Sequence, residues 1–320
     1  KLIIFYLLKL NKPKFWDKKI GFFSITLLPI TLIYIFLNFL IKKFVKVKKF
    51  QIPVICVGNI YLGGTGKTPI SILLAKELSK FGKKIVILRK YYKNHLDEYN
   101  LIKNNFESLI VSKNRSEGLT KLEKSNFDLV ILDDGLQDYK IRKDLKIVCF
   151  SSNQLVGNNL PLPSGPLRES LSALKDVKIV IINGDKNENF ERQILNVNEN
   201  LEIFYSYYKP INLEKFKNKK LFVVAGIGNP ENFFQLLEKN NLNIFEKKVY
   251  PDHYTFSKNE IENIIDKAKK QNCQIIMTEK DYFKIGEYKS NKISYLKVLL
   301  KINSQDNLIK KINKLYDKKD

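Results

Sequence analysis

Apolar and polar positions alternate along the chain with two periods. Short β-branched runs bounded by glycine or proline are typical of buried parallel strands, and apolar residues three or four positions apart are typical of amphipathic helices. The first pattern predicts strands at 54–58, 84–88, 108–111, 128–132, 146–150 and 178–182. The second predicts helices at 68–81 and near 116–124. This alternation predicts an α/β fold built on a parallel sheet.

A second, smaller unit follows residue 200. The polar stretch 187–200 predicts a loop or a short helix, and the alternating aromatic residues of 202–208 predict a connecting strand. Beyond it, the pattern predicts a strand, a helix and two more strands at 221–225, 231–239, 275–277 and 298–300. We therefore expect one α/β domain at 48–200 and a smaller α/β domain at 201–320, joined by a β linker.

The N-terminal part, residues 1–47, has a different character. Residues 20–41 form a run of 22 residues without a charge, which is about 33 Å as a helix and enough to cross a bilayer core. Lysines flank the run, and Trp16 and Tyr34 are candidate interface anchors. We expect a membrane-anchoring helix here, and Pro29 also permits a helix that enters one leaflet only. A buried core helix is the alternative, while the length of the run and the missing cleavage site argue against a signal peptide.

The net charge is +23 and the pI is near 9.6. Nearly all of this charge is lysine spread along the whole chain, and no nucleic-acid reader motif accompanies it, so we expect no nucleic-acid partner. A basic chain favours anionic membranes or phosphorylated substrates. Cys56, Cys149 and Cys273 lack metal-site spacing and indicate reduced thiols in a cytosol-facing protein.

The most informative motif is the glycine-rich stretch Gly63-Gly64-Thr65-Gly66-Lys67-Thr68. It follows the predicted strand 54–58 and precedes a helix with Pro69 in its first turn. A strand, a glycine loop, Lys-Thr and a helix form the arrangement in which backbone amides hold a phosphate. In this arrangement Lys67 reaches the β- and γ-phosphates, and the Thr68 hydroxyl is a ligand of Mg²⁺. A chance glycine turn is the alternative.

Two aspartates end another predicted strand. Residues 128–132 are apolar after Asp128, and Asp133 and Asp134 follow. In phosphate-loop proteins an acid at the end of the neighbouring strand holds Mg²⁺ directly or through water. The alternative for such a pair is a turn or a helix cap, and it applies most to Asp134, which precedes a glycine.

Other candidate residues carry weaker signals by themselves. Asp97 and Glu98 lie in the predicted loop after the second strand, where a carboxylate can accept a proton from an attacking hydroxyl. His253 lies between Asp252 and Tyr254, which makes it a candidate acid, base or orienting group. A solvated turn and an exposed histidine are the alternatives. The few arginines of this lysine-rich chain mark positions where a planar fork is needed, and they are Arg89, Arg115, Arg142, Arg168 and Arg192.

Taken in order, these motifs resemble those of the tetraacyldisaccharide 4′-kinases, the lipid A 4′-kinases of Gram-negative bacteria. The resemblance covers nearly the whole chain, through the stretches 57–60, 63–69, 133–137, 160–169, 225–230, 252–254 and 277–281. The N-terminal apolar segment of the chain is similar to that of the family as well. The chain departs from the family pattern in the shortened loop that contains Leu96 and Tyr99, and in Asp138 after Gln137.

The resemblance implies MgATP-dependent transfer of the γ-phosphate to the 4′-hydroxyl of a lipid-linked glucosamine disaccharide. It implies a monomer at the inner membrane with its catalytic domains facing the cytoplasm. Lys67 and Thr68 would hold the nucleotide phosphates and Mg²⁺, with Asp133 and Asp134 as the metal-side acids. Asp97 would be the base, paired with His253. The remaining implied site residues are Arg168 as a further catalytic group, and Glu98, Gln137 and Arg89 near the substrate.

Arg168 and the overall function each have an alternative interpretation. Arg168 offers a fork for spreading phosphoryl charge, although a Pro-Leu-Arg-Glu turn can also hold a structural ion pair. A membrane-associated phosphate-loop ATPase that works as a switch through protein partners is the alternative function. Such proteins carry an extra lysine just before the paired glycines, where this chain has Leu62, and they attach by a terminal amphipathic helix.

Overall fold

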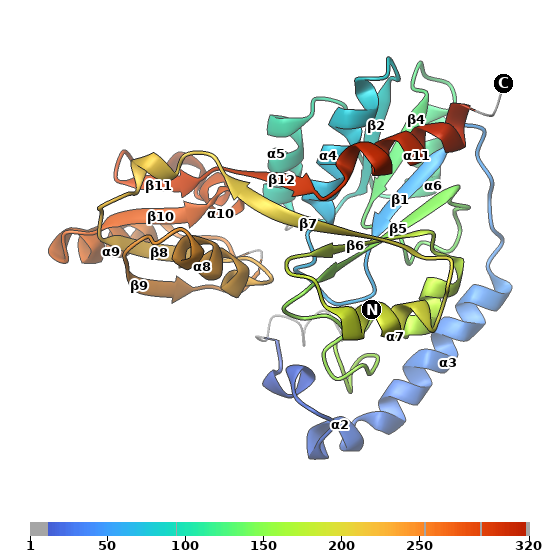
Figure 1. The fold of residues 1–320 in the computed structure, drawn as a ribbon, viewed down its shortest axis with the longest axis horizontal. Coiled ribbons are helices and arrows are strands. Elements are labelled where there is room, and N and C mark those ends of the chain that lie inside the picture. The colour runs from blue at the N-terminus through green and yellow to red at the C-terminus, as the bar shows by residue number, and fades with distance from the viewer. Residues whose placement is uncertain (1–11, 94, 253, 289, 318–320) are drawn as a thin grey trace. The chain divides into compact units, whose positions relative to one another are not determined.

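The computed structural model describes residues 12–93, 95–252, 254–288 and 290–317 (Figure 1). It divides into two compact units, each with its own sheet and core. Unit 1 is Lys1–Tyr91, Phe106–Tyr207 and Ile302–Asp320, and unit 2 is Tyr92–Asn105 and Tyr208–Lys301. These boundaries differ from the predicted domains at 48–200 and 201–320. Residues from before the linker join the second unit, and the C-terminal segment returns to the first.

The strands of unit 1 belong to an eight-stranded sheet in the order β12-β7-β6-β5-β1-β4-β2-β3, in which most of β12 and the end of β7 fall within the residue range of unit 2. The pairings described from β3 across to β7 are parallel, as the β-branched runs predict. The strands are β1 (Val54–Gly58), β2 (Ile85–Lys90), β3 (Leu109–Ser112), β4 (Leu129–Asp133), β5 (Leu145–Ser151), β6 (Ile179–Asn183), β7 (Glu202–Pro210) and β12 (Val298–Ile302). β4 lies between β1 and β2, so Asp133 is in register with Val57 on one side and Arg89 on the other.

Helices cover this sheet and bury it. Side chains of α6, η2 and α7 pack with alternate residues of the central strands in one core cluster, and α4 contacts β1, β2 and β4, with α11 beside it (Figure 1). The helical segments of unit 1 are η1 (Lys14–Asp17), α2 (Phe22–Thr26), α3 (Leu28–Phe44), α4 (Lys67–Ser79), α6 (Arg115–Leu122), η2 (Leu171–Asp176), α7 (Glu188–Leu195) and α11 (Gln305–Asp317). The carboxyl ends of β1 and β4 therefore meet the start of α4, which is where the phosphate loop lies.

The N-terminal apolar run is not one long helix. It forms α2 and α3, which meet at Leu27. Pro29 has no amide proton to donate to the carbonyl of Ile25, and its ring disfavours a continuous helix at that point. Among the described parts of the chain, no helix combines the length and the apolar character needed to cross a bilayer. The prediction of a single membrane-anchoring helix over 20–41 is therefore not supported.

Unit 2 has a four-stranded parallel sheet in the order β11-β10-β8-β9. Its strands are β8 (Leu221–Ala225), β9 (Ile244–Val249), β10 (Gln274–Thr278) and β11 (Ile293–Leu296). Its helical segments are α5 (Leu96–Asn105), η3 (Leu213–Lys215), α8 (Pro230–Lys239), α9 (Lys258–Lys270), α10 (Glu279–Lys284) and η4 (Gly286–Tyr288). Side chains of α8 and α9 belong to two separate core clusters, so the sheet is covered on both faces. α5 packs against α10, and it replaces the loop that the sequence predicts around Asp97.

Candidate active site

The phosphate loop has the geometry that its glycines predict. β1 ends at Gly58 and α4 begins at Lys67, with Gly66 at the N-cap. Gly63, Gly64 and Gly66 have φ values of 86°, 55° and 83°, which glycine adopts without the cost that a Cβ imposes. No side chain caps α4 in the described structure. The first amides and the positive end of the helix dipole therefore form an anion site at this turn.

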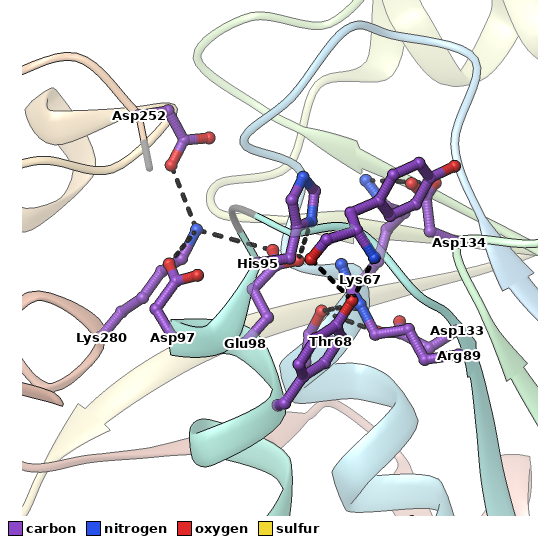
Figure 2. Close-up of polar contacts among 12 residues, drawn as sticks. Lys67, Thr68, Arg89, His95, Asp97, Glu98, Asp133, Asp134, Asp252 and Lys280 are labelled. Atoms are coloured by element: carbon purple, nitrogen blue, oxygen red, sulfur yellow. Dashed lines mark hydrogen bonds and ion pairs between the residues drawn. The ribbon is translucent and has the colours of Figure 1, made fainter. Parts of the chain in front are cut away.

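Asp133 is the most deeply buried member of the site. It has no exposed surface, and its two oxygens accept hydrogen bonds from the hydroxyls of Thr68 and Ser71, each at 3.0 Å. Arg89 forms an ion pair with the same carboxylate and also donates to Thr68 Oγ1 at 3.1 Å (Figure 2). The carboxylate therefore fixes the orientation of the Thr68 hydroxyl at the start of α4.

Asp134 is held in a left-handed conformation, with φ of 55°. Arg115 NH2 donates to the carbonyl oxygens of Asp133 at 3.1 Å and Asp134 at 2.6 Å, and both contacts stabilise this turn. The Asp134 carboxylate then lies 3.0 Å from Arg168 NH1 and 3.6 Å from Lys67 Nζ. Asp134 is thus the shared counter-charge of the two cations nearest the phosphate loop.

Burial and charge act in opposite directions on these groups. Burial alone would raise the pKa of Asp134, but the positive charges of Arg168, Lys67, Arg89 and Arg115 outweigh it and hold the pKa below the ordinary value. Burial lowers the pKa of Lys67, and the carboxylates of Asp134 and Asp133 offset this only in part. The site therefore keeps Asp134 ionised and carries an excess of positive charge, as a binding place for polyanionic phosphates requires.

Gln137 connects the double-aspartate turn to the segment that carries Arg168. Its Nε2 donates to the carbonyl of Asn59 and to Glu169 Oε1, each at 3.0 Å, and its Oε1 accepts from Arg168 NH1 at 3.2 Å. The structure brings Gln137 and Arg168 together with Lys67 and Asp134, all of which the sequence nominates.

A second polar cluster lies in unit 2. Asp97 and Glu98 are in the first turn of α5, and Lys280 Nζ lies 3.3 Å from Asp97, 3.5 Å from Glu98 and 3.1 Å from Asp252 (Figure 2). Lys284 approaches Asp97 at 3.7 Å. Burial lowers the pKa of Lys280, but the charges of Asp252 and Asp97 outweigh it and raise the pKa. Two lysines thus flank the Asp97 carboxylate.

The histidine that the sequence nominates lies outside the described residues. His253 is at position 253, of which nothing is described. His95 is described, and its Nδ1 lies 2.9 Å from Glu98 Oε2.

The sequence did not assign roles to Ser71, Arg115, Lys280, Lys284 and Glu169. Arg115 carried a signal as an arginine in a lysine-rich chain, and Glu169 and Lys280 lie in the stretches 160–169 and 277–281 that resemble the family. Ser71 is one helical turn after Lys67, so its hydroxyl reaches the same side of α4 as Thr68. Only the pairing of β1 with β4 places Asp133 beside that side of the helix.

Comparisons with known proteins agree with the motifs. A family model described as tetraacyldisaccharide-1-P 4′-kinase matches residues 23–317. Two relatives named tetraacyldisaccharide 4′-kinase come from Pelagibacter ubique and Rickettsia akari. The first is 42% identical over 97% of this chain and 100% of its own length, and the second is 36% identical over 96% and 98%.

A solved structure supports the fold. LpxK from Aquifex aeolicus, crystallised in complex with ATP, is similar with a TM-score of 0.67 and 24% identity, over 92% of this chain and 100% of that protein. This likeness confirms the predicted α/β class with a parallel sheet. The family model spans most of the chain and the relatives match it along their full length, so this chain belongs to the tetraacyldisaccharide-1-P 4′-kinase family.

Proposed function

We propose that this chain transfers the γ-phosphate of ATP to the 4′-hydroxyl of a tetraacyl glucosamine disaccharide, a precursor of lipid A. The observation that carries the proposal is the paired arrangement at the head of α4, where Thr68 is bound to Asp133 and Lys67 lies beside Asp134 and Arg168. Relatives of the same length are named for this reaction. Phosphoryl transfer depends mainly on alignment and charge neutralisation, which this arrangement supplies.

The nucleotide phosphates occupy the glycine loop in this proposal. The amides of Gly63, Gly64, Thr65 and Gly66 hold the phosphate oxygens, with Lys67 reaching the β- and γ-phosphates. Arg168 supplies a planar fork for the transferred group. Arg89 is buried between Asp133 and Thr68, so we assign it to orienting these two residues rather than to contacting the acceptor.

The oxygen donors of the site fit Mg²⁺. Thr68 donates its hydroxyl proton to Asp133 and accepts from Arg89, which leaves one lone pair of the hydroxyl oxygen for a hard cation. Asp133 already accepts bonds from Thr68, Ser71 and Arg89, so it fits an outer position, while Asp134 is the more accessible acid. When bound, the cation would be held by Thr68 and Asp134 and would supply positive charge that neutralises the phosphates.

Asp97 is the proposed base. The acceptor hydroxyl forms a new O–P bond, the bond from the γ-phosphorus to the ADP oxygen breaks, and the hydroxyl proton passes to the Asp97 carboxylate. Lys280 and Lys284 flank that carboxylate at 3.3 Å and 3.7 Å. The pairing of Asp97 with His253 remains a prediction from the family resemblance, as do the substrate roles of Glu98 and Gln137.

A membrane location is part of the proposal. α2 and α3 expose large apolar side chains, including Phe22 (75% exposed), Leu32 (64%) and Phe44 (73%). Thr31, by contrast, is only 1% exposed. A helix that buries its polar side and exposes its apolar side is suited to lie in a bilayer interface. Lipid A precursors are membrane lipids, so we place the chain as a monomer at the cytoplasmic face of the inner membrane.

The test is a transfer assay with labelled ATP, Mg²⁺ and a detergent-dispersed tetraacyldisaccharide 1-phosphate, with the lipids separated by thin-layer chromatography. We expect a labelled lipid from the wild-type protein and almost none from Lys67→Ala. Lys76→Ala is the matched control, because Lys76 is an exposed lysine on the same helix. ATP turnover that depends on a protein partner and forms no labelled lipid would instead support the switch interpretation.

A further inference from the structure

The segment that carries Arg168 is held from two sides. On the first side it pairs with the chain that leads into the phosphate loop. Leu62 donates its amide to the carbonyl of Pro166 at 2.9 Å, and Arg168 donates its amide to the carbonyl of Ile60 at 2.6 Å. These two backbone bonds place Arg168 beside the loop. They hold only one side of the segment, so its other side needs different partners.

The second side is supported by the polar face of α3. Tyr34 donates its hydroxyl to the carbonyl of Arg168 at 2.8 Å. One turn earlier, Thr31 Oγ1 bonds Ser164 Oγ at 2.8 Å and accepts from the Ser164 amide at 3.1 Å. At the end of the helix, Lys42 forms an ion pair with Glu169. Three turns of α3 therefore contact the segment on both sides of Arg168.

The Lys42 contact continues to the phosphate site. The Glu169 side chain is only 7% exposed, and it accepts from Gln137 Nε2 at 3.0 Å. Because the amide nitrogen of Gln137 points to Glu169, its oxygen points to Arg168 NH1 at 3.2 Å. Arg168 in turn lies 3.0 Å from Asp134 Oδ1. An unbroken polar chain thus runs from Lys42 through Glu169, Gln137 and Arg168 to Asp134.

We propose that Tyr34 and Lys42 are positioning residues for Arg168, so that α3 is a working part of the phosphate site. Tyr34 fixes the Arg168 backbone, and Lys42 holds Glu169 in place as the acceptor of Gln137. The same helix exposes its apolar side to the surroundings. The position of α3 on the segment therefore links that apolar surface to the placement of Arg168 at the phosphate site. This inference rests on the role of Arg168 given under the proposed function.

The experiment measures kcat and the KM for ATP in the detergent-dispersed transfer assay with saturating acceptor. Tyr34→Phe removes one hydroxyl and Lys42→Met removes one charge, and each is expected to lower kcat about threefold to tenfold with little change in KM. Lys42→Arg should restore most of the rate. Lys43→Met removes a charge at the neighbouring position, where the ammonium lies near the rings of Phe39 and Phe44, and should retain the wild-type kcat.

A double-substitution series separates positioning from general stability. Tyr34→Phe and Lys42→Met should lower kcat further by less than about twofold when Arg168→Lys is already present, because the guanidinium they position is gone. Thermal unfolding of every variant identifies any loss of folded protein. Full and additive losses in the Arg168→Lys background, or rates equal to Lys43→Met, would overturn the inference. A wild-type kcat for Arg168→Lys would instead overturn the role of Arg168 in the proposed function.

Discussion

The ion pair between Arg89 and Asp133 offers a quantitative test of how the site is built. The two side chains are 3% and 0% exposed, so Arg89→Met leaves an interior carboxylate that keeps its hydrogen bonds from Thr68 and Ser71 but loses its ion-pair partner. Removing one member of a buried pair costs about 3–5 kcal/mol. Asp133→Asn added to Arg89→Met removes the remaining charge and keeps the side chain's size. We therefore expect the double variant to be more stable than Arg89→Met alone.

The free energy of unfolding is measured by urea titration. Trp16 is the single tryptophan of the chain and is only 5% exposed in unit 1, so its fluorescence reports on the unfolding of that unit. Far-UV circular dichroism follows the loss of secondary structure in the whole chain. Arg142→Met is the matched control, since Arg142 is exposed, and it should change stability by less than about 0.5 kcal/mol. A double variant less stable than Arg89→Met would refute the view of Asp133 as a buried charge that depends on Arg89.

Three other predictions concern the acids of the two units. Arg115→Met should lower kcat about tenfold or more, because two charge-assisted bonds that hold the Asp134 turn are lost; an unchanged kcat would show that the turn needs no such support. Asp134 has a pKa below its ordinary value of 3.8. Its contribution to the free energy of unfolding is therefore present above that pH and is lost as the pH falls. The gap in unfolding free energy between wild type and Asp134→Asn, measured by urea titration, should therefore narrow below pH 3.8, and a constant gap would contradict it. Asp97→Asn should abolish most lipid labelling while nucleotide binding, measured by calorimetry, persists; normal transfer would exclude Asp97 as the base.

The phosphate loop was predictable because its determinants are contiguous. The strand, the three glycines with positive φ and the helix start all lie between Val54 and Ser79, and each has a local conformational signature. Asp133 was predictable for a related reason, since an apolar strand that ends in an acid next to such a loop is a recurrent arrangement. The family motifs nominated Gln137 and Arg168 as site residues, although the sequence did not indicate that the two side chains contact each other.

The N-terminal run shows where local pattern fails. Its 22 uncharged residues predict a membrane-anchoring helix that is long enough to cross a bilayer. The break at Leu27 follows from Pro29, but the hydrogen bonds of Thr31 with Ser164 and of Tyr34 with Arg168 join residues more than 130 positions apart. The loop predicted around Asp97 is likewise a helix, α5, which packs against α10 of the same unit.

By itself the sequence determined the α/β class, the phosphate loop and the family, because β-branched periodicity, glycine conformations and contiguous motifs are properties of neighbouring residues. The tertiary structure alone decided which charges meet: Arg89 with Asp133, Arg168 with Asp134, Lys42 with Glu169, and Lys280 with Asp97. Each of these pairs joins residues separated by many positions, and their contact depends on how strands and helices pack. A charge has no partner until the fold places one within reach, and that placement sets the burial and the pKa on which the chemistry depends.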